Sequence, residues 1–153
     1  MGGIPQWEAF LKVGAEFGFH PRRPDVLAFA RRRRVLLVRH ETSGLSADLV
    51  VAALPFEQEV IRQARTKVLG DIHVAVPSAE NLIIMKAVAS RPRDLADIEA
   101  VLDANPRVNL ARVRGWVRKF SAALEAPEIL DELERVLVAR RRRKKAGPAR
   151  RGV

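Results

Sequence analysis

Two short apolar runs joined by a turn, in the first third of the chain, restrict the fold more than any other feature. Residues 34–40 (RVLLVRH) form a continuous run rich in valine and leucine that is too short for a helix, so they predict a buried strand. Residues 42–44 (TSG) supply turn residues, and residues 47–53 (ADLVVAA) predict the partner strand. The chain must therefore contain a β-hairpin with a face to bury.

Helical and strand patterns lie on both sides of this hairpin. Apolar residues recur with helical spacing through residues 4–11, and Gly18 is placed to end that helix in a left-handed conformation. After the hairpin, Pro55 begins a helix that we expect to reach about residue 64, and residues 72–76 form a third short strand that Pro77 ends.

The second half of the chain is predicted to be helical. Ser78 is a helix cap, and the body of that helix (LIIMKAVA) is apolar nearly all round, with Lys86 as the exception. Three further apolar stripes follow, at residues 95–102, 110–120 and 129–137. We therefore expect an α/β fold, a small mixed sheet with a hairpin followed by a helical C-terminal half, in one domain (1–139) with a sheet part (1–76) and a helical part (77–139).

Composition excludes several classes of protein. At 153 residues, 48% of them hydrophobic, the chain can build one buried core. The absence of cysteine rules out disulfides, thiolate metal sites and thiol chemistry. With neither an apolar run of about 20 residues nor a signal-peptide layout, we expect no membrane association and a cytoplasmic protein.

The formal charge of +10 is concentrated near the C-terminus. Eight basic residues and no acidic residue lie in residues 140–151, whereas the rest of the chain has 20 basic and 18 acidic residues. A like-charge block with glycine and proline predicts a disordered tail over residues 140–153. The alternative is electrostatic attraction to RNA, DNA or an acidic partner. The candidate nucleic-acid contacts are Arg140, Arg141, Arg142, Arg143, Lys144 and Lys145.

Asp48 is an acidic residue in the middle of an otherwise apolar strand. Burying an unpaired carboxylate costs free energy, so this group needs a partner or a metal ion. It can instead lie at a solvent-exposed strand position or form an ion pair with an arginine. Both interpretations remain open from the residues alone.

A charge cluster follows in the segment KAVASRPRDLADIEA. Asp94 and Asp97 are three residues apart and share a helix face, while Lys86 and Arg91 precede the break at Pro92, so opposite charges can converge at one corner. The cluster is either an ion-pair network or a site where Lys86 reaches a phosphate. The three histidines show no metal-ligand spacing, and the chain has no P-loop, no GxGxxG and no GxSxG.

Two stretches carry a resemblance to a known family. ADLVVAALPFEQEVI contains an Asp-bearing strand followed by a Leu-Pro-Phe-Glu helix start, and VAVPSAENLIIMKAVASRPRDLADIEAVL contains Pro-x-x-Glu-x-Leu, Lys-x-x-Ala-x-Arg and Arg-Asp-x-x-Asp-Ile. Because of these two stretches, residues 18–137 resemble bacterial nucleotidyltransferase-superfamily proteins related to the AbiEii-type abortive-infection toxins. Those proteins share the fold of the DNA polymerase β catalytic core.

The resemblance implies a site in which three carboxylates hold two divalent metal ions. Asp48 matches the third carboxylate, as a catalytic residue and metal ligand. Lys86 is expected as a second catalytic residue that touches phosphate, and with Asp94 or Asp97 it matches charged positions of the helical half. Arg91, Asp94 and Asp97 form the supporting charge cluster. The Gly-Ser turn and Asp-x-Asp pair of the family are missing from this sequence.

Two classes of function follow from this resemblance and its departure. The first is magnesium-dependent nucleotide transfer from a nucleoside triphosphate, provided that an upstream segment completes the site; in this chain alone no cofactor is expected. The second is a catalytically inactive binding subunit of a toxin–antitoxin or phage-defence pair with a cognate protein partner, or a basic nucleic-acid-binding protein.

Overall fold

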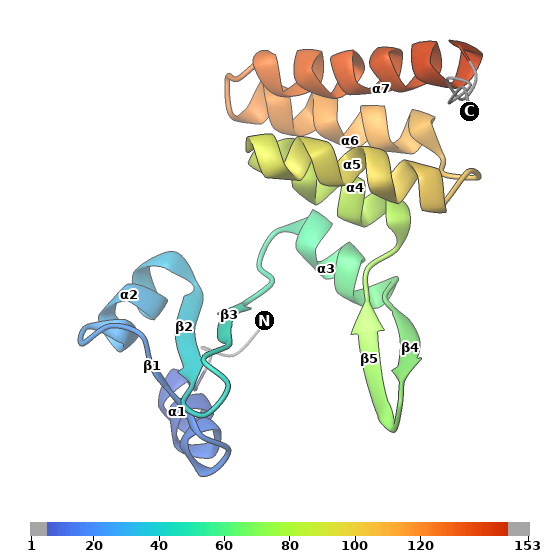
Figure 1. The fold of residues 1–153 in the computed structure, drawn as a ribbon. Coiled ribbons are helices and arrows are strands. Elements are labelled where there is room, and N and C mark those ends of the chain that lie inside the picture. Colours follow the sequence, from blue (N-terminus) through green and yellow to red (C-terminus); the bar gives the residue numbers. More distant parts are fainter. Residues whose placement is uncertain (1–5, 147–153) are drawn as a thin grey trace. The chain divides into compact units, whose positions relative to one another are not determined.

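The computed structural model describes residues 6–146, in which short strands and helices form two compact units (Figure 1). The first unit is Met1–Gln58 and the second is Glu59–Val153. We expected one domain with a change from sheet to helix after residue 76. The division between the units instead falls inside helix α3 (Pro55–Arg62), and each unit contains both strands and helices.

The first unit is a three-stranded antiparallel sheet with two helices. Its sheet has the order β1-β2-β3, from β1 (Phe19–Pro21), β2 (Val35–His40) and β3 (Ser46–Val50). The hairpin is confirmed: β2 and β3 pair antiparallel, with Leu37 opposite Asp48. The expected mixed sheet is not found, because every strand pair in the described residues is antiparallel.

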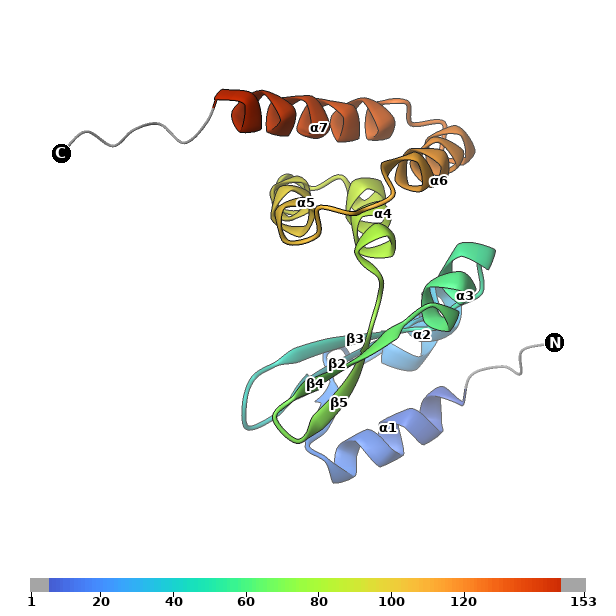
Figure 2. The ribbon, with the colours of Figure 1, turned by 90° about the vertical axis from the view of Figure 1, so that its right-hand side faces the viewer.

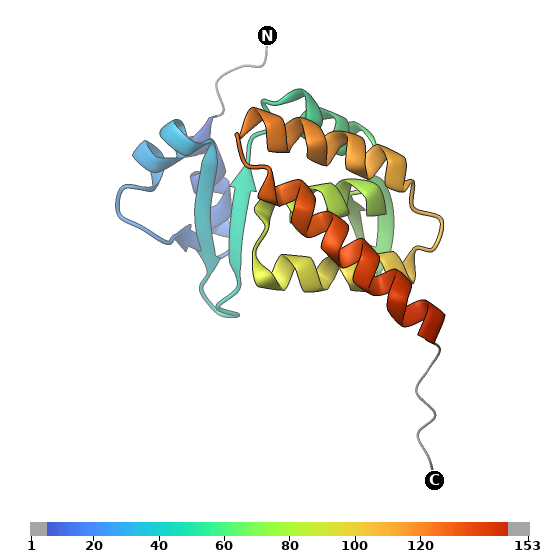
Figure 3. The same ribbon diagram turned by 90° about the horizontal axis from the view of Figure 1, so that it is seen from above.

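The alternation of side chains along β2 sets the core of this unit. Leu36 and Val38 are buried with Trp7, Val26 and Ala30, which belong to α1 (Trp7–Glu16) and α2 (Val26–Arg33). Both helices lie on one side of the sheet (Figure 3). Because successive side chains alternate between the two faces of a strand, Asp48 lies on the face opposite Leu36 and Val38.

The turns of the first unit depend on residues with positive φ. Gly18 follows α1 with φ of 75°, as expected for a left-handed helix end, and a Cβ there would come within 3.2 Å of the His40 ring. Arg34 ends α2 with φ of 59°. Arg31, Arg32 and Arg33 form the last turn of α2. Ile4 and Pro5, expected in the first helix, lie outside the described residues.

The second unit begins with the C-terminal turn of α3 and a two-stranded hairpin. β4 (Arg65–Leu69) pairs antiparallel with β5 (Ile72–Val76) around Gly70, whose φ is 60°. The strand at residues 72–76 is confirmed, whereas β4 was not expected. Figure 2 shows β4 and β5 as paired ribbons, from which the chain continues into α4.

Four helices complete the second unit: α4 (Ala79–Ala89), α5 (Pro92–Ala104), α6 (Leu110–Ala123) and α7 (Glu128–Ala146). Ser78 caps α4 by accepting a hydrogen bond from the Asn81 backbone N–H at 3.2 Å, as expected. Fully buried side chains from all four helices meet in one core, which includes Ile83, Ile98, Val113 and Leu133. None of the helices within residues 6–146 is long and apolar enough to cross a membrane.

The prediction of a disordered tail from residue 140 is wrong for residues 140–146. These residues continue α7 to Ala146, so the helix is 19 residues long. Arg140 donates to Asp103 at 2.9 Å and to the Leu102 carbonyl at 2.9 Å, which ties this part of α7 to α5. The remaining part of the expected tail, residues 147–153, lies outside the described residues.

Candidate functional site

Asp48 lies on the open face of the β1-β2-β3 sheet. Its side chain is 57% exposed, and its Oδ1 accepts a hydrogen bond from Arg22 Nη2, at the end of β1. The two residues come together because Arg22 N–H bonds to the Leu37 carbonyl and Leu37 pairs with Asp48 across β2 and β3. The carboxylate therefore avoids the cost of burial by exposure and ion pairing, one of the two arrangements expected from the sequence.

The acidic groups near Asp48 do not fit a two-metal centre. Within residues 6–146, no group of three or more His, Cys, Asp or Glu side chains is placed to hold a metal ion. One carboxylate paired with a guanidinium cannot provide the several oxygen ligands that two divalent cations require. Asp48 can contribute to such a centre only together with acidic groups from elsewhere.

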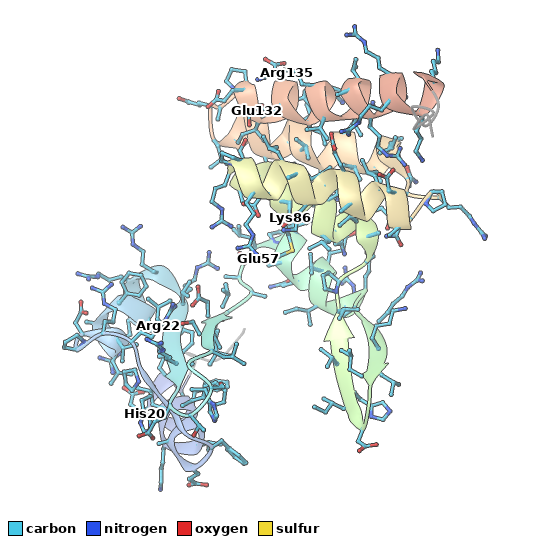
Figure 4. The ribbon with its side chains drawn as sticks, viewed as in Figure 1. His20, Arg22, Glu57, Lys86, Glu132 and Arg135 are labelled. Carbon is cyan, nitrogen blue, oxygen red and sulfur yellow. The ribbon has the colours of Figure 1, made fainter. Side chains whose placement is uncertain are left out.

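A shallow, open pocket lies in the same unit. His20 Nε2 is 3.2 Å from Glu41 Oε2, and Arg39 Nε donates to the Gly44 carbonyl at 3.1 Å, so these side chains are already held by protein groups. Figure 4 shows where His20 and Arg22 project from β1 and the residues after it. The lining combines cationic, acidic and imidazole groups; its residues are His20, Pro21, Arg22, Arg39, His40 and Glu41.

The predicted cluster on α4 and α5 does form. Lys86 Nζ lies 2.6 Å from Asp97 Oδ2 and 3.4 Å from Asp94 Oδ1. Arg91 Nε donates to Asp94 Oδ2 at 2.5 Å. The helix break at Pro92 turns α5 back along α4, so the two carboxylates of α5 face the lysine of α4 (Figure 4). Two cations thus share two carboxylates.

The electrostatics of this cluster are those of a closed ion-pair network. The Arg91 guanidinium, followed by Lys86, holds the pKa of the buried Asp94 carboxyl below its usual value. The hydrogen bond from Lys86 to Asp97, with that to Asp94, raises the pKa of Lys86. Two of the three donors of Lys86 Nζ and the Nε donor of Arg91 are used inside the cluster, so the charge of Lys86 is already compensated by Asp94 and Asp97.

The sequence-predicted residues therefore divide between two places. Asp48 belongs to the first unit, whereas Lys86, Arg91, Asp94 and Asp97 belong to the second. The structure brings together the four members of the charge cluster, and it gives Asp48 a partner, Arg22, that lies 26 residues away in sequence.

A second buried polar network was not predicted. Arg112 Nη2 donates to Asn81 Oδ1 at 2.8 Å and to Glu59 Oε1 at 2.7 Å, and the Asn81 amide donates to Gln63 at 3.4 Å. Asn81 is fully buried, and this hydrogen bonding lowers the pKa of Glu59. The signal was an asparagine in a helix that is apolar nearly all round, since a buried amide needs partners.

No model of a known protein family matches this chain, and no curated protein matches it either.

Proposed function

We propose that this chain is a nucleotidyltransferase-like protein in which Asp48 is one acidic group of a nucleotide-processing site and the other acidic groups come from outside the chain. One observation carries the proposal. Asp48 is an exposed carboxylate at the middle residue pair of the antiparallel β2–β3 hairpin. It lies on the sheet face that α1 and α2 leave uncovered. Pairing with β2 holds this strand in place and leaves the carboxylate uncovered.

The charge cluster of the helical half restricts the proposed site. Lys86, Arg91, Asp94 and Asp97 form an internally neutral network, which makes them a structural element of that half. We therefore assign Lys86 a positioning role between α4 and α5. The site residue of the described chain is Asp48, with Arg22 as the group that neutralises it.

The proposal predicts that the isolated chain binds magnesium and a nucleoside triphosphate only weakly. With one carboxylate available, and that one paired with Arg22, we expect no saturation below millimolar nucleotide in calorimetric titrations with Mg²⁺ and ATP. Micromolar binding that depends on Mg²⁺ and disappears in Asp48→Ala would show that the chain's own residues complete a site.

Activity is tested after complementation. If the DNA upstream of the Met1 codon encodes a Gly-Ser turn and an Asp-x-Asp pair in frame, the extended protein should incorporate labelled nucleotide, and Asp48→Asn should reduce incorporation at least a hundredfold. Asp71→Asn is the matched control, because Asp71 is an exposed acid beside the β4–β5 turn. Equal activity of the Asp48 and Asp71 variants would exclude a catalytic role for Asp48, whereas no incorporation by the extended wild-type protein would favour a catalytically inactive binding subunit.

A further inference from the structure

The C-terminal turns of α7 carry six consecutive basic residues whose side chains have two different environments. Three of them form ion pairs with α5 and three do not form an ion pair with any described residue. The first three are Arg140, Arg143 and Lys144; the others are Arg141, Arg142 and Lys145.

The inward group is occupied by acidic residues of α5. Arg140 Nε lies 2.9 Å from Asp103 Oδ1, and its side chain is only 16% exposed. Lys144 Nζ lies 3.6 Å from the same carboxylate oxygen, and Arg143 pairs with Glu99. These three cations are spaced at i, i+3 and i+4, so they share the helix face toward α5.

The outward group remains exposed to solvent. Arg141, Arg142 and Lys145 are all exposed, and within residues 6–146 none of them is paired with an acid. Arg141 and Lys145 are four residues apart and therefore lie on one face, about 6 Å apart along the helix axis. Their charge is available to an external anion.

The neighbouring helix α6 adds to this positive charge. Glu134 of α7 accepts two hydrogen bonds from Arg114, at 2.5 and 3.0 Å. Arg118 is exposed on α6, one helical turn after Arg114, and the pKa of Glu134 is lowered first by Arg114 and then by the charges of Arg141 and Arg118. The junction of α6 and α7 thus carries an excess of positive charge that the fold leaves uncompensated.

The chemistry of this surface favours a polyanion. On the described part of α7, Val138 is the one exposed large hydrophobic residue, at 43%, so the helix lacks the apolar face that membrane-surface helices insert. Arginine guanidinium groups bind phosphate oxygens in a bidentate geometry. The outward set contains no aromatic side chain on which a base could stack.

We propose that Arg118, Arg141, Arg142 and Lys145 form a face that binds the phosphate backbone of nucleic acid without sequence preference. This face is a structured part of α6 and α7. Of the six basic residues 140–145, only the outward group of Arg141, Arg142 and Lys145 contacts the ligand. The inference is independent of Asp48 and goes beyond the nucleotide-processing role proposed above.

The test compares two charge-matched triple variants of the full chain. The probes are a fluorescein-labelled 20-nucleotide oligo(U) and a 20-base-pair DNA duplex, titrated by anisotropy from 25 to 300 mM KCl. Each lost phosphate contact lowers the slope of log affinity against log salt by about 0.7 for a single strand and about 0.9 for a duplex. Arg141→Gln/Arg142→Gln/Lys145→Gln should therefore lower the slope by about 2 to 3.

The inward variant Arg140→Gln/Arg143→Gln/Lys144→Gln removes the same charge and should keep the wild-type slope within one unit, while its melting temperature falls. If that variant does not fold, Arg143→Gln alone replaces it as the inward control and should leave the slope unchanged, because this 63% exposed side chain pairs with Glu99. Arg118→Gln on α6 is a second outward variant, with an expected slope change of about 0.7 to 0.9.

Three outcomes would overturn the inference. The outward triple variant could bind with the wild-type slope, both triple variants could lose equal slope, or the wild type could bind phosphatidylserine vesicles more tightly than either nucleic acid. Asp48→Asn should leave nucleic-acid affinity unchanged, so failure of this inference is distinguishable from failure of the proposed function.

Discussion

Asp94 is the most buried carboxylate of the described chain, with 6% of the residue exposed, and it shows how the second unit accommodates charge. Arg91 and Lys86 both donate to it, so its burial does not leave an uncompensated charge. Because Lys86 also donates to Asp97, the cluster joins α4 to α5 beside the apolar contacts of Ile98.

This arrangement predicts how acid affects folding. The folded-state pKa of Asp94 is lowered, first by Arg91, so the stabilising contribution is present above the unfolded-state pKa of about 3.9 and is lost as pH falls through the folded-state pKa. Asp94→Asn should melt below the wild type at pH 7. The difference between the two melting temperatures should shrink steadily below about pH 4, in circular dichroism melts from pH 2.5 to 7.

Lys86 has the opposite pH dependence. Its pKa is raised, so its stabilising contribution is lost only as pH rises through the folded-state pKa, above the usual value near 10.4.

Asp131→Asn is the control for the acid melts of Asp94→Asn, because Asp131 is exposed on α7 and forms no ion pair with a described residue. A constant difference between wild type and Asp94→Asn across the whole range would mean that the buried carboxylate gains nothing from its partners.

These residues also show what sequence could and could not give. Convergence of Lys86, Asp94 and Asp97 was predictable because helix spacing and a proline break are local features. The pairing of Arg22 with Asp48 could not be predicted. It depends on the register of β1, a three-residue strand with no periodicity of its own. The proposed metal-ligand role of Asp48 stays a prediction.

Helix α4 is limited at each end by a serine, and the two serines act differently. Ser78 is an ordinary N-terminal cap. Ser90 ends the helix with φ of 51°, a conformation that costs a residue with a Cβ roughly 1 kcal/mol or more, while its hydroxyl donates to Glu132 of α7. The end of α4 therefore combines backbone strain with a contact between helices.

Two substitutions at Ser90 separate these effects. Ser90→Ala loses the hydrogen bond and keeps the strain, whereas Ser90→Gly loses the hydrogen bond and relieves the strain. The glycine variant should be more stable than the alanine variant by about 1 kcal/mol in urea unfolding. Ala89, one residue earlier inside the helix, should show the reverse order, with Ala89→Gly destabilising by up to about 1 kcal/mol. An alanine variant at position 90 at least as stable as glycine would contradict a left-handed Ser90.

The elements that sequence patterns missed share a physical cause. β4 carries arginine, threonine and lysine and is exposed along its whole length, so its apolar pattern is weak and pairing with β5 defines it. The extension of α7 through the basic run was missed because like charges predict repulsion. Asp103 and Glu99 of α5, which are distant in sequence, form ion pairs with three of these cations.

Each unit has a core of its own, and each core includes or adjoins one of the two tryptophans. Trp7 is 3% exposed and packs with Leu36 and Val38 in the first unit. Trp116 lies on α6 of the second unit, with its ring centroid 6.1 Å from that of Phe120. The division inside α3 could not be inferred from composition, because the apolar stripes on both sides of it are equally suited to one shared core.

The two tryptophans make the independence of the units measurable. In a Trp116→Phe background, fluorescence reports Trp7 alone, and in a Trp7→Phe background it reports Trp116 alone. Leu36 is fully buried in the first unit, so Leu36→Ala should cost about 2 to 5 kcal/mol there. In urea unfolding, the midpoint reported by Trp7 should fall, and the midpoint reported by Trp116 should change much less.

Ile98→Ala is the reciprocal variant in the second unit. Ile98 is fully buried among α4–α7, and Ile98→Ala should lower the Trp116 midpoint by a similar free energy while the Trp7 midpoint is retained. Both variants remove a branched aliphatic side chain from a fully buried position, so a difference between the probes reflects location and not the size of the perturbation. If either variant moves both midpoints equally, the chain unfolds as one cooperative body and the two cores are thermodynamically coupled.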